Sequence, residues 1–537
     1  MSSPVSQPAI AQLKAEGDAL FRQKEYTRAY QKYSEALTSD PENAVLYCNR
    51  AACSSGLNRY LDALRDANKG LGHHSVAIQA WEKALAALPQ TEPVSEPTRR
   101  QRAEYSALIT VAKGKSAACA VDVRKRVRPW HERLRLDAAR WPWTLAADRI
   151  PELRRSGEWK SSAWLIDHAH REWEAGISIM RQVQVIPSSI ENVYEFRGRM
   201  GCLLHLSDAL LLDPRTFKYV APEEYDFLEL YESQARMEIQ HEGGWPDGGS
   251  QTVIREATAR LAGDLPSLRK ALSITIRDWI LRGWFNVTFL GAFDAAIEYY
   301  SSALDVLQWG MEQWADVDVV ERGLVFQEAI IRGVKILRLE VYMEAYKAQP
   351  GSDSRYPLQE LGHGAKALLD ELKQERVQPL YEAENSIFLG FVRYQLAAVY
   401  SIYGFYYHHE ARNLSNVSGY SLDSDEVQAL YELSVAGYLE AADIYPTDDE
   451  HHFWSLYVAF NLIYEIGSPV GRLLHILERI HDTMAEIKQV REVALVTGPA
   501  ERKGAYDSLM ALRIDFLTSI RQGVLTRQTP VMRRPVT

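Results

Sequence analysis

The stretch Leu13–Asn43, LKAEGDALFRQKEYTRAYQKYSEALTSDPEN, decides how this chain folds. Small and aromatic residues recur there at helical spacing and a proline closes the unit, at Gly17, Ala29, Tyr33, Ala36 and Pro41. Small residues let two helices approach closely, an aromatic residue packs against the next helix pair, and a proline stops a helix. The stretch therefore predicts a pair of helices that forms one packing unit.

The same spacing recurs in the next stretch of the chain. Ala63 lies 34 residues after Ala29, and Ala51 lies 34 residues after Gly17. This period resembles that of the tetratricopeptide repeat (TPR), a helix–turn–helix unit of about 34 residues. The resemblance implies that residues 9–89 form an amino-terminal TPR module with two full repeats and part of a third.

The third unit of this module is incomplete. The segment GHHSVAIQAWEKALAALP, residues 72–89, matches the second helix of a repeat at Ala77, Trp81, Ala84 and Pro89. Ala77 follows Ala63 by only 14 residues, so 20 residues are missing, which is one helix and its turn. The helix was lost from the gene, or the coding sequence is mis-spliced, or residues 77–88 form a capping helix that mimics the motif. Four simultaneous matches favour loss.

The rest of the chain is organised as helices. Residues 90–102 are rich in proline and charge and form a linker, whereas residues 103–522 show helical apolar spacing almost throughout. TPR-like positions recur in Thr275–Leu307 and Leu430–Glu450. We predict an all-α fold in which TPR-type helix-turn-helix repeats form an α-solenoid, followed by a flexible tail over residues 523–537. The expected breaks are Gly243–Gln251, Gln349–Pro357 and Asn413–Asp425.

Four blocks in the long helical region also resemble an uncharacterised fungal family of TPR-like proteins. They are TIRDWILRGWF (275–285), LDVLQWGMEQW (304–314), RGLVFQEAIIRGVK (322–335) and YPTDDEHHFW (445–454). The resemblance covers roughly residues 97–480 and agrees with the predicted fold. It implies no site residues and no substrate.

Composition limits the classes of function. The formal charge of −10 and the pI of about 5.9 provide no global positive field that would attract nucleic acid or anionic membranes. The four cysteines are too few and too scattered for a disulfide framework or a zinc site. No window holds about 18 uninterrupted apolar residues. We therefore expect a soluble protein of a reducing compartment, cytoplasmic or nuclear, that does not enter membranes.

A carboxylate clamp is the most specific binding site that a resemblance suggests. LKAEGDALF and LYCNRAAC resemble the repeats of co-chaperones whose clamp grips the free carboxyl terminus of a heat-shock chaperone. That clamp uses a lysine and an asparagine of the first repeat, an asparagine of the second, and a lysine and an arginine of the third, because charge-assisted donors suit a carboxylate. Lys14 and Asn49 match two of the five positions. Asp18 replaces the first-repeat asparagine, and the third-repeat pair falls in the missing helix.

The peptide-binding candidates are therefore Lys14, Asp18 and Asn49, and three interpretations of them remain open. Lys14 is a solvated surface residue and Asn49 bonds within its repeat, or the two residues still form a clamp, or the groove holds a different peptide. The first interpretation is favoured, because most polar helix residues bind no ligand and Asp18 would repel a carboxylate.

The sequence gives little support for nucleotide binding, metal binding or catalysis. Val111–Ser116 (VAKGKS) ends like a phosphate-binding loop but lacks the first glycine. The histidine pairs, such as His451 and His452, point about 100° apart on a helix and do not present two metal ligands on one face. His168 and Glu172 have i, i+4 spacing, for which an intrahelical hydrogen bond is the common outcome. We expect no catalytic residues, no metal and no cofactor.

The segment Val123–Trp143, VRKRVRPWHERLRLDAARWPW, supports an alternative function. Its basic residues and interleaved tryptophans suit a nuclear or nucleic-acid-associated scaffold. The charged face of an amphipathic helix explains the same pattern and is favoured. We predict a non-catalytic protein-interaction scaffold whose partner is a protein or peptide, with a co-chaperone role for the amino-terminal module as the specific version. The oligomeric state is not predicted.

Overall fold

A computed structural model describes most of the chain. The described residues are 7–40, 43–57, 59, 62, 66, 141–187, 194–219, 227–246, 248–351, 354–374, 385–416, 421–490 and 499–531. The incomplete third repeat, the linker at 90–102, the VAKGKS segment and all of the basic segment except Trp141–Trp143 lie outside them.

The amino-terminal module begins with three helices, α1 (Gln7–Arg22), α2 (Tyr26–Ser39) and α3 (Ala44–Gly56). Each helix contacts the other two. Ala29, Tyr33 and Ala36, which the repeat pattern assigned to the packing face, are all buried on α2. The predicted helix pair of the first repeat is therefore present.

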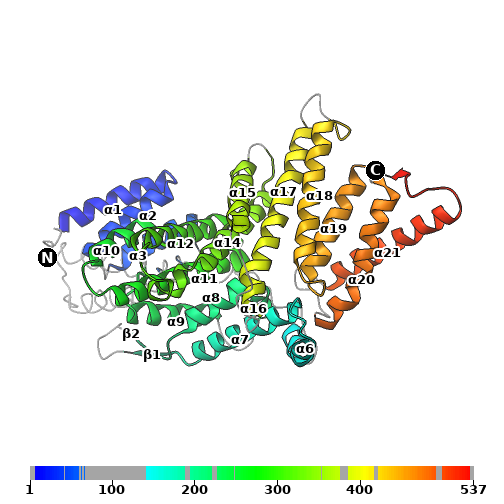
Figure 1. Ribbon diagram of the computed structural model, residues 1–537. Coiled ribbons are helices and arrows are strands. Elements are labelled where there is room, and N and C mark those ends of the chain that lie inside the picture. Colours follow the sequence, from blue (N-terminus) through cyan, green and yellow to red (C-terminus); the bar gives the residue numbers. More distant parts are fainter. Residues whose placement is uncertain are drawn as a thin grey trace, which may run out of the picture.

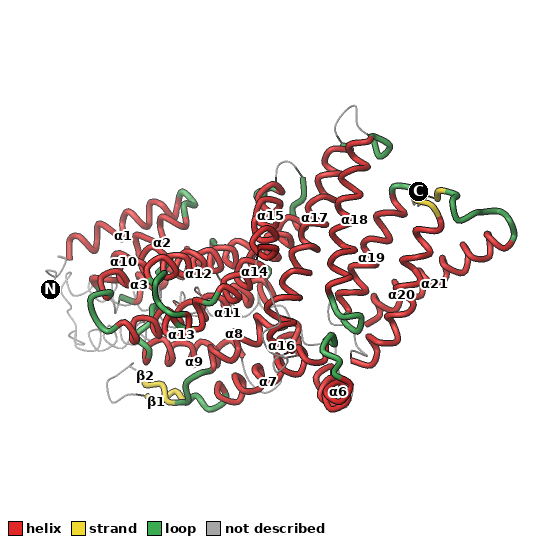
Figure 2. The backbone as a smooth tube through the Cα atoms, in the orientation of Figure 1, coloured by secondary structure: helices red, strands yellow, loops and turns green. Residues whose placement is uncertain are grey.

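In the next described part of the chain, a short β-hairpin interrupts a series of helices. The helices are α6 (Pro142–Ser156), α7 (Ser162–Met180), α8 (Cys202–Leu212), the 3-10 helix η2 (Pro214–Tyr219), α9 (Phe227–His241) and α10 (Ser250–Arg260). Strands β1 (Gln184–Pro187) and β2 (Tyr194–Arg197) pair antiparallel, with Val185 opposite Phe196. Figure 2 shows this hairpin at the edge of a mainly helical molecule.

Long helices follow and stack in chain order across Figure 1. They are α11 (Leu265–Leu290), α12 (Phe293–Gln313), α14 (Glu328–Ala348), α15 (Leu358–Gln374), α17 (Gln395–Ser415), α18 (Asp425–Ile444), α19 (Glu450–Glu465), α20 (Val470–Val490) and α21 (Pro499–Arg521). Each contacts the next in this series. Short elements join them, namely α13 (Val319–Arg322), η3 (Leu324–Phe326), α16 (Asn385–Phe388) and the π-helical turn η5 (Leu389–Tyr394). The all-α solenoid predicted from the sequence is confirmed.

The three expected breaks coincide with connections between helices. Gly243–Gln251 spans the turn between α9 and α10, Gln349–Pro357 separates α14 from α15, and Asn413–Asp425 covers the end of α17 and the start of α18. In the first two breaks, Gly243 and Gly244 follow α9 and Pro350 follows α14, and these residues lack helical preference or a backbone donor.

One packing device recurs along the solenoid: a glycine on one helix faces a tyrosine ring on the next. A Cβ atom added at Gly17 would lie 2.7 Å from the Tyr33 ring, and one at Gly283 of α11 would lie 2.6 Å from the Tyr300 ring of α12. Gly404 of α17 faces Tyr438 of α18 in the same way, at 2.8 Å. The small residue lets the ring lie directly on the neighbouring backbone; in the first unit Tyr33 thus packs on Gly17 of its own repeat, whereas the repeat pattern predicted packing on the next helix pair.

Gly283→Ala tests this device. The Tyr300 ring is fully buried and cannot swing aside, so we expect the added methyl group to lower the free energy of unfolding by about 1–3 kcal/mol. Gly504→Ala is the matched control, because it lies in α21 with no heavy atom near its Cβ position, and there alanine should stabilise by about 0.5–1 kcal/mol. Urea unfolding followed by circular dichroism measures both. Shifts in the same direction would contradict the steric account.

The buried core runs through the solenoid without a clear division. One apolar cluster joins α7–α12 and α14 residues such as Leu337 and Val341, and a second joins other α14 residues, such as Ile336 and Leu339, to α15 and α17–α21. Phe293 and Ile297 of α12 pack against both clusters. The amino-terminal module has a small core of its own around Ala29, Tyr33 and Leu37.

Two features depart from a simple linear stack. The helices α6 and α7 return to the carboxyl-terminal half, where α6 contacts α20 and Val490 joins the apolar cluster of α6. Residues 523–531, expected within a flexible tail, return to the start of α20. There β3 (Ser468–Pro469) pairs antiparallel with β4 (Pro530–Val531), and the Gly471 amide donates to the Arg527 carbonyl at 2.8 Å. Backbone pairing therefore fixes this part of the tail.

Candidate peptide-binding groove

Asp18 is the centre of the groove formed by α1, α2 and α3. Its carboxylate accepts three hydrogen bonds: from Lys14 Nζ at 2.8 Å, from the Tyr33 hydroxyl at 2.6 Å and from Asn49 Nδ2 at 3.1 Å. The structure thus brings the three candidate residues Lys14, Asp18 and Asn49 together. Lys14 and Asn49, which were expected to donate to the carboxylate of a ligand, instead donate to the Asp18 carboxylate of the chain itself.

The electrostatics of Asp18 agree with this arrangement. Burial raises the pKa of the Asp18 carboxyl, but the hydrogen bonds from Lys14 and Tyr33 more than offset it, so the pKa lies below its ordinary value. The carboxylate is therefore ionised at neutral pH and holds its donors as charge-assisted bonds. The Lys14–Asp18 pair has side chains 38% and 33% exposed, so solvent can reach it and the donors can be competed for.

A hollow of about 360 Å³ opens beside Asp18, which is a volume typical of ligand-binding clefts. It is lined by Asp18, Phe21, Arg22, Tyr33, Asn49 and Ala52. Sequence reasoning placed Tyr33 only in the core and did not consider Arg22. The signal was available for Arg22, since Lys14, Asp18 and Arg22 follow one another at i, i+4 spacing and so share a helix face.

Arg50, the neighbour of Asn49, stabilises the amino-terminal module and does not line the groove. Its Nε and Nη2 atoms each donate to Asp66 at 2.7 Å, and both side chains are buried. A bidentate arginine–carboxylate pair of this kind fixes geometry strongly. It ties α3 to Asp66, 16 positions further along the chain.

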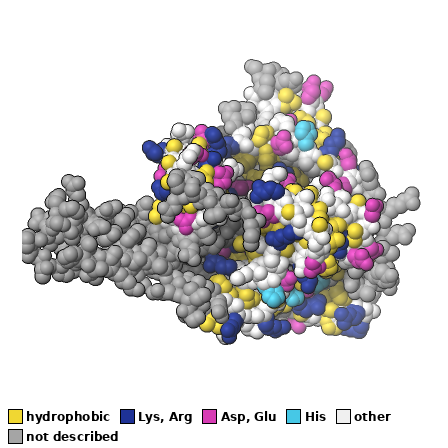
Figure 3. All heavy atoms as spheres, turned by 90° about the vertical axis from the view of Figure 1, so that its left-hand side faces the viewer, with side chains coloured by type: hydrophobic (Ala, Val, Ile, Leu, Met, Phe, Trp, Pro, Cys, Tyr) yellow, Lys and Arg dark blue, Asp and Glu magenta, His cyan; other side chains and the backbone are white. Residues whose placement is uncertain are grey.

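The module is anchored on the solenoid through α12. Arg59 Nη1 donates to Glu298 Oε1 at 2.9 Å, and the Tyr299 hydroxyl donates to Asp62. The Arg59 guanidinium also lies over the Tyr299 ring, 5.5 Å from its centroid. The groove therefore has a fixed position beside α12 (Figure 1). On the molecular face seen in Figure 3, positive and negative side chains of the described residues are interspersed.

The histidines singled out in the sequence make local polar contacts. His168 Nε2 lies 3.7 Å from Glu172, and His205 Nδ1 lies 2.7 Å from the same carboxylate. His452 is buried, with Nδ1 2.7 Å from the Ala442 carbonyl, whereas His451 contacts Asp449. Within the described ranges, no group of three or more His, Cys, Asp or Glu side chains has the arrangement of a metal site.

A buried ionic cluster explains the acidic run of YPTDDEHHFW, whose role the sequence did not reveal. Arg215 of η2 donates to Asp213 at 2.7 and 3.0 Å and to Asp449 at 2.9 Å through two nitrogens. Burial alone would raise the pKa of Asp449, but the Arg215 guanidinium outweighs it and holds that pKa well below its ordinary value. Asp448 meanwhile accepts from the Ser162 amide at 2.8 Å, at the start of α7. The acidic run therefore connects the start of α19 to η2 and to the start of α7.

These observations define a helical-repeat protein of the α-solenoid class with a small peptide-sized groove at one end. Comparisons with known proteins identify the repeats. Small glutamine-rich tetratricopeptide repeat-containing protein beta of Homo sapiens is 47% identical over 55 residues, which are 10% of this chain and 18% of that protein. The heat shock protein sti1 homolog of Schizosaccharomyces pombe is 38% identical over 77 residues, 14% and 13% of the two chains. DnaJ homolog subfamily C member 7 of Homo sapiens is 32% identical over 101 residues, 18% and 20%.

Over these stretches the chain is similar to tetratricopeptide repeat proteins, among them proteins named for heat-shock and DnaJ homology, which agrees with the repeat pattern of its amino-terminal residues. It spans a fifth or less of the length of these relatives. No protein-family model matches it. A crystal structure of yeast Tom70 aligns with 90% of this chain and 96% of that chain at 14% identity, with a TM-score of 0.13, too low to indicate a common arrangement. Across the described helices, none is long and apolar enough to traverse a bilayer.

Proposed function

We propose that the chain is a non-catalytic scaffold for protein interactions and that the groove around Lys14, Asp18 and Asn49 binds a peptide. The finer version is that this peptide is the carboxyl terminus of a heat-shock chaperone. The resemblance of the repeats to co-chaperone repeats supports both statements and supports a cytoplasmic location. The basic segment at 123–143 lies almost wholly outside the described residues, so no contact favours the nucleic-acid alternative.

One observation carries the proposal: Lys14 and Asn49 direct their donors to a single carboxylate beside an open hollow. Donors with this geometry can hold a carboxylate group. A peptide carboxylate has to take the place of the Asp18 side chain, and until it does so it is repelled by a like charge. The groove is therefore a clamp filled by its own chain, and we expect weak binding in the native protein.

Asp18→Asn should convert this groove into a stronger carboxylate site. The substitution removes the competing charge and supplies the amide that co-chaperone clamps carry at this position. Relief of like-charge repulsion of about 1–2 kcal/mol corresponds to roughly five- to thirtyfold tighter binding. The measurement is a calorimetric titration of the full chain and the variant with an acidic peptide that ends in a free carboxylate.

Two controls make this titration decisive. The same peptide amidated at its carboxyl end should lose most of the gain, because the amide carries no charge. Adding Lys14→Ala and Asn49→Ala to the variant should abolish carboxylate-dependent binding. If Asp18→Asn binds neither peptide, the groove is not a carboxylate site and the search for partners moves to the solenoid.

A further inference from the structure

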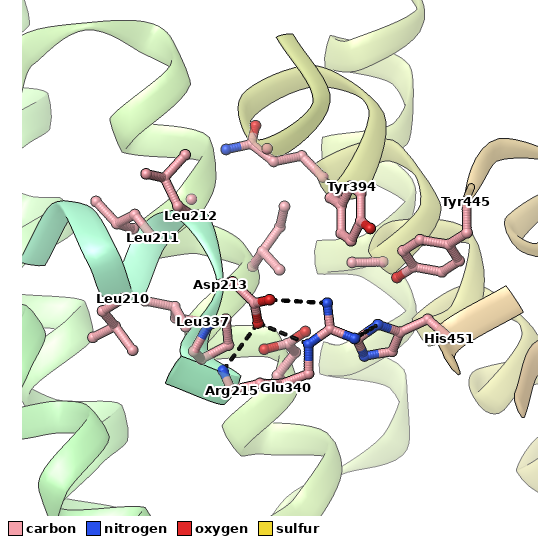
Figure 4. A pocket seen from close by; sticks show the side chains of 16 residues that line it. Leu210, Leu211, Leu212, Asp213, Arg215, Leu337, Glu340, Tyr394, Tyr445 and His451 are labelled. Carbon is pink, nitrogen blue, oxygen red and sulfur yellow. Dashed lines mark hydrogen bonds and ion pairs between the residues drawn. The ribbon is translucent and has the colours of Figure 1, made fainter. Parts of the chain in front are cut away.

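A second cavity lies in the solenoid and shares no lining residue with the amino-terminal groove. Four segments distant in sequence enclose it: the end of α8 with η2, the middle of α14, η5 with the start of α17, and the turn that leads into α19 (Figure 4). Its volume is about 90 Å³. Ligand clefts for nucleotides or drug-sized molecules measure roughly 300–1,000 Å³, and one water occupies about 30 Å³, so this cavity suits only a small chemical group.

The cavity wall is mainly apolar and has two acidic residues, of which Asp213 is paired with Arg215 and Glu340 is not. Leu210, Leu211, Leu212, Ile336, Leu337 and Ala398 supply most of the apolar surface. Glu340 of α14 lines the cavity, and among the described residues it makes no hydrogen bond and no ion pair within 4.0 Å. Glu340 is half-buried and has no cation of the described residues within 4.0 Å, so its charge is compensated only in part and is costly to form. Burial accordingly raises the pKa of Glu340 to about 7.

The ionic cluster beside Glu340 excludes an anionic ligand. The guanidinium of Arg215 is already held by Asp213 and Asp449, and Glu450 lies 3.8 Å from it. The cluster therefore carries more negative than positive charge, and Glu340 adds to this excess when it ionises. A positively charged group is the complementary occupant.

The aromatic side of the cavity favours the same kind of occupant. The Tyr394 and Tyr445 rings meet edge to face with centroids 5.2 Å apart, and His451 stacks on Tyr445 at 5.1 Å. Tyrosine faces attract cations through their ring quadrupole. The apolar wall formed by the α8 leucines would contact the stem of an alkyl chain.

We propose that this cavity binds a primary ammonium group on a short alkyl stem, with Glu340 as its carboxylate partner. The stem lies against the leucines of α8, and the ammonium group donates to Glu340 beside the tyrosine rings. A free alkylamine and a lysine side chain of a partner protein present the same chemistry. Binding involves no covalent step: Glu340 releases its proton to solvent and receives the cation in its place.

Titration of the full chain with n-butylammonium tests the proposal, with n-butanol as the uncharged probe of the same length. We expect saturable n-butylammonium binding by nuclear magnetic resonance, none with n-butanol, and loss of binding in Glu340→Gln. Glu328→Gln is the control, because Glu328 lies on the same helix with its side chain 68% exposed and outside the cavity. Equal binding of both probes, unchanged binding in Glu340→Gln, or no binding at high millimolar concentration would each overturn the proposal.

The pH dependence adds an independent readout. Since the pKa of Glu340 is about 7, the affinity for n-butylammonium should fall about thirtyfold from pH 8 to pH 5.5 as the carboxyl group takes up its proton. The other charged and titratable groups around it are Glu344 and Lys347 on α14, Asp213 and Arg215 at η2, Tyr300 on α12, Tyr394 on η5, and Tyr445, Asp449 and His451 near α19. Glu340→Gln distinguishes the titration of Glu340 from that of His451, because the variant retains the histidine.

A competition experiment distinguishes the two sources of the ammonium group. Competition by a blocked glycyl-lysyl-glycine peptide would identify the source as a partner's lysine, and its failure would identify a free amine.

Discussion

Arg215→Met is expected to lower the free energy of unfolding by about 3–5 kcal/mol. The variant keeps the length of the side chain but leaves Asp213 and Asp449 facing each other without a cation. Both carboxylates are at most 3% exposed, so water cannot replace the lost bonds. Breaking a buried ion pair on one side is costly because the remaining charge stays uncompensated in a poorly polarisable interior.

The effect should reach beyond the site of substitution. Asp449 caps the start of α19 by accepting from the His451 amide at 2.8 Å, and Tyr394 donates to the same carboxylate at 2.7 Å. Loss of Arg215 therefore weakens contacts between α8, η5 and α19 together. Limited proteolysis should cut the variant faster near these elements.

Arg472→Met is the matched control for this experiment. Arg472 also forms a bidentate pair, with Glu432 at 2.6 and 2.7 Å, but the two side chains are 37% and 48% exposed. An exposed pair contributes at most about 1 kcal/mol. Urea midpoints of the two variants measure the difference, and equal losses would show that burial of the Arg215 cluster has no energetic consequence.

Raising the pH from 5 to 8 should destabilise the protein through Glu340, by at most about 3 kcal/mol. The pKa of this carboxyl is 4.5 ordinarily and about 7 in the folded chain, because burial disfavours its charged form and Glu344 repels it. Between these values the folded state binds more protons than the unfolded state. Linkage then makes the free energy of unfolding fall as pH rises, and the stability is fully present only below the ordinary value.

Glu340→Gln isolates this contribution from every other titrating group. Glutamine has the same shape but no charge, so the variant should lose this part of the pH dependence and be more stable than the native protein at pH 8. Urea midpoints at pH 5 and pH 8 for both proteins measure the difference. An identical pH dependence in the two proteins would mean that solvent reaching the cavity screens Glu340 fully.

The sequence identified the candidate groove residues, but it did not predict which hydrogen bonds these residues make. The repeat resemblance identified Lys14 and Asn49, and Asp18 was recognised as a charge that opposes a carboxylate ligand. The structure adds that the Asp18 side chain itself occupies the position between the donors and that Tyr33 joins them. Side-chain direction depends on the packing of three helices, which the residue types alone do not specify.

The sequence by itself determined the helical class, the repeat unit and the positions of the turns. These follow from local rules: a period of 3.6 residues favours helices, small residues such as Gly17 allow close approach, and glycine or proline follows many of the helices. Only the tertiary structure decided that α6 and α7 return to α20, that residues 526–531 pair beside Ser468, and that Arg215 meets Asp449. The last two residues are 234 positions apart. No local period encodes such a contact, because the burial of a charged residue depends on which distant helices pack together in the folded chain.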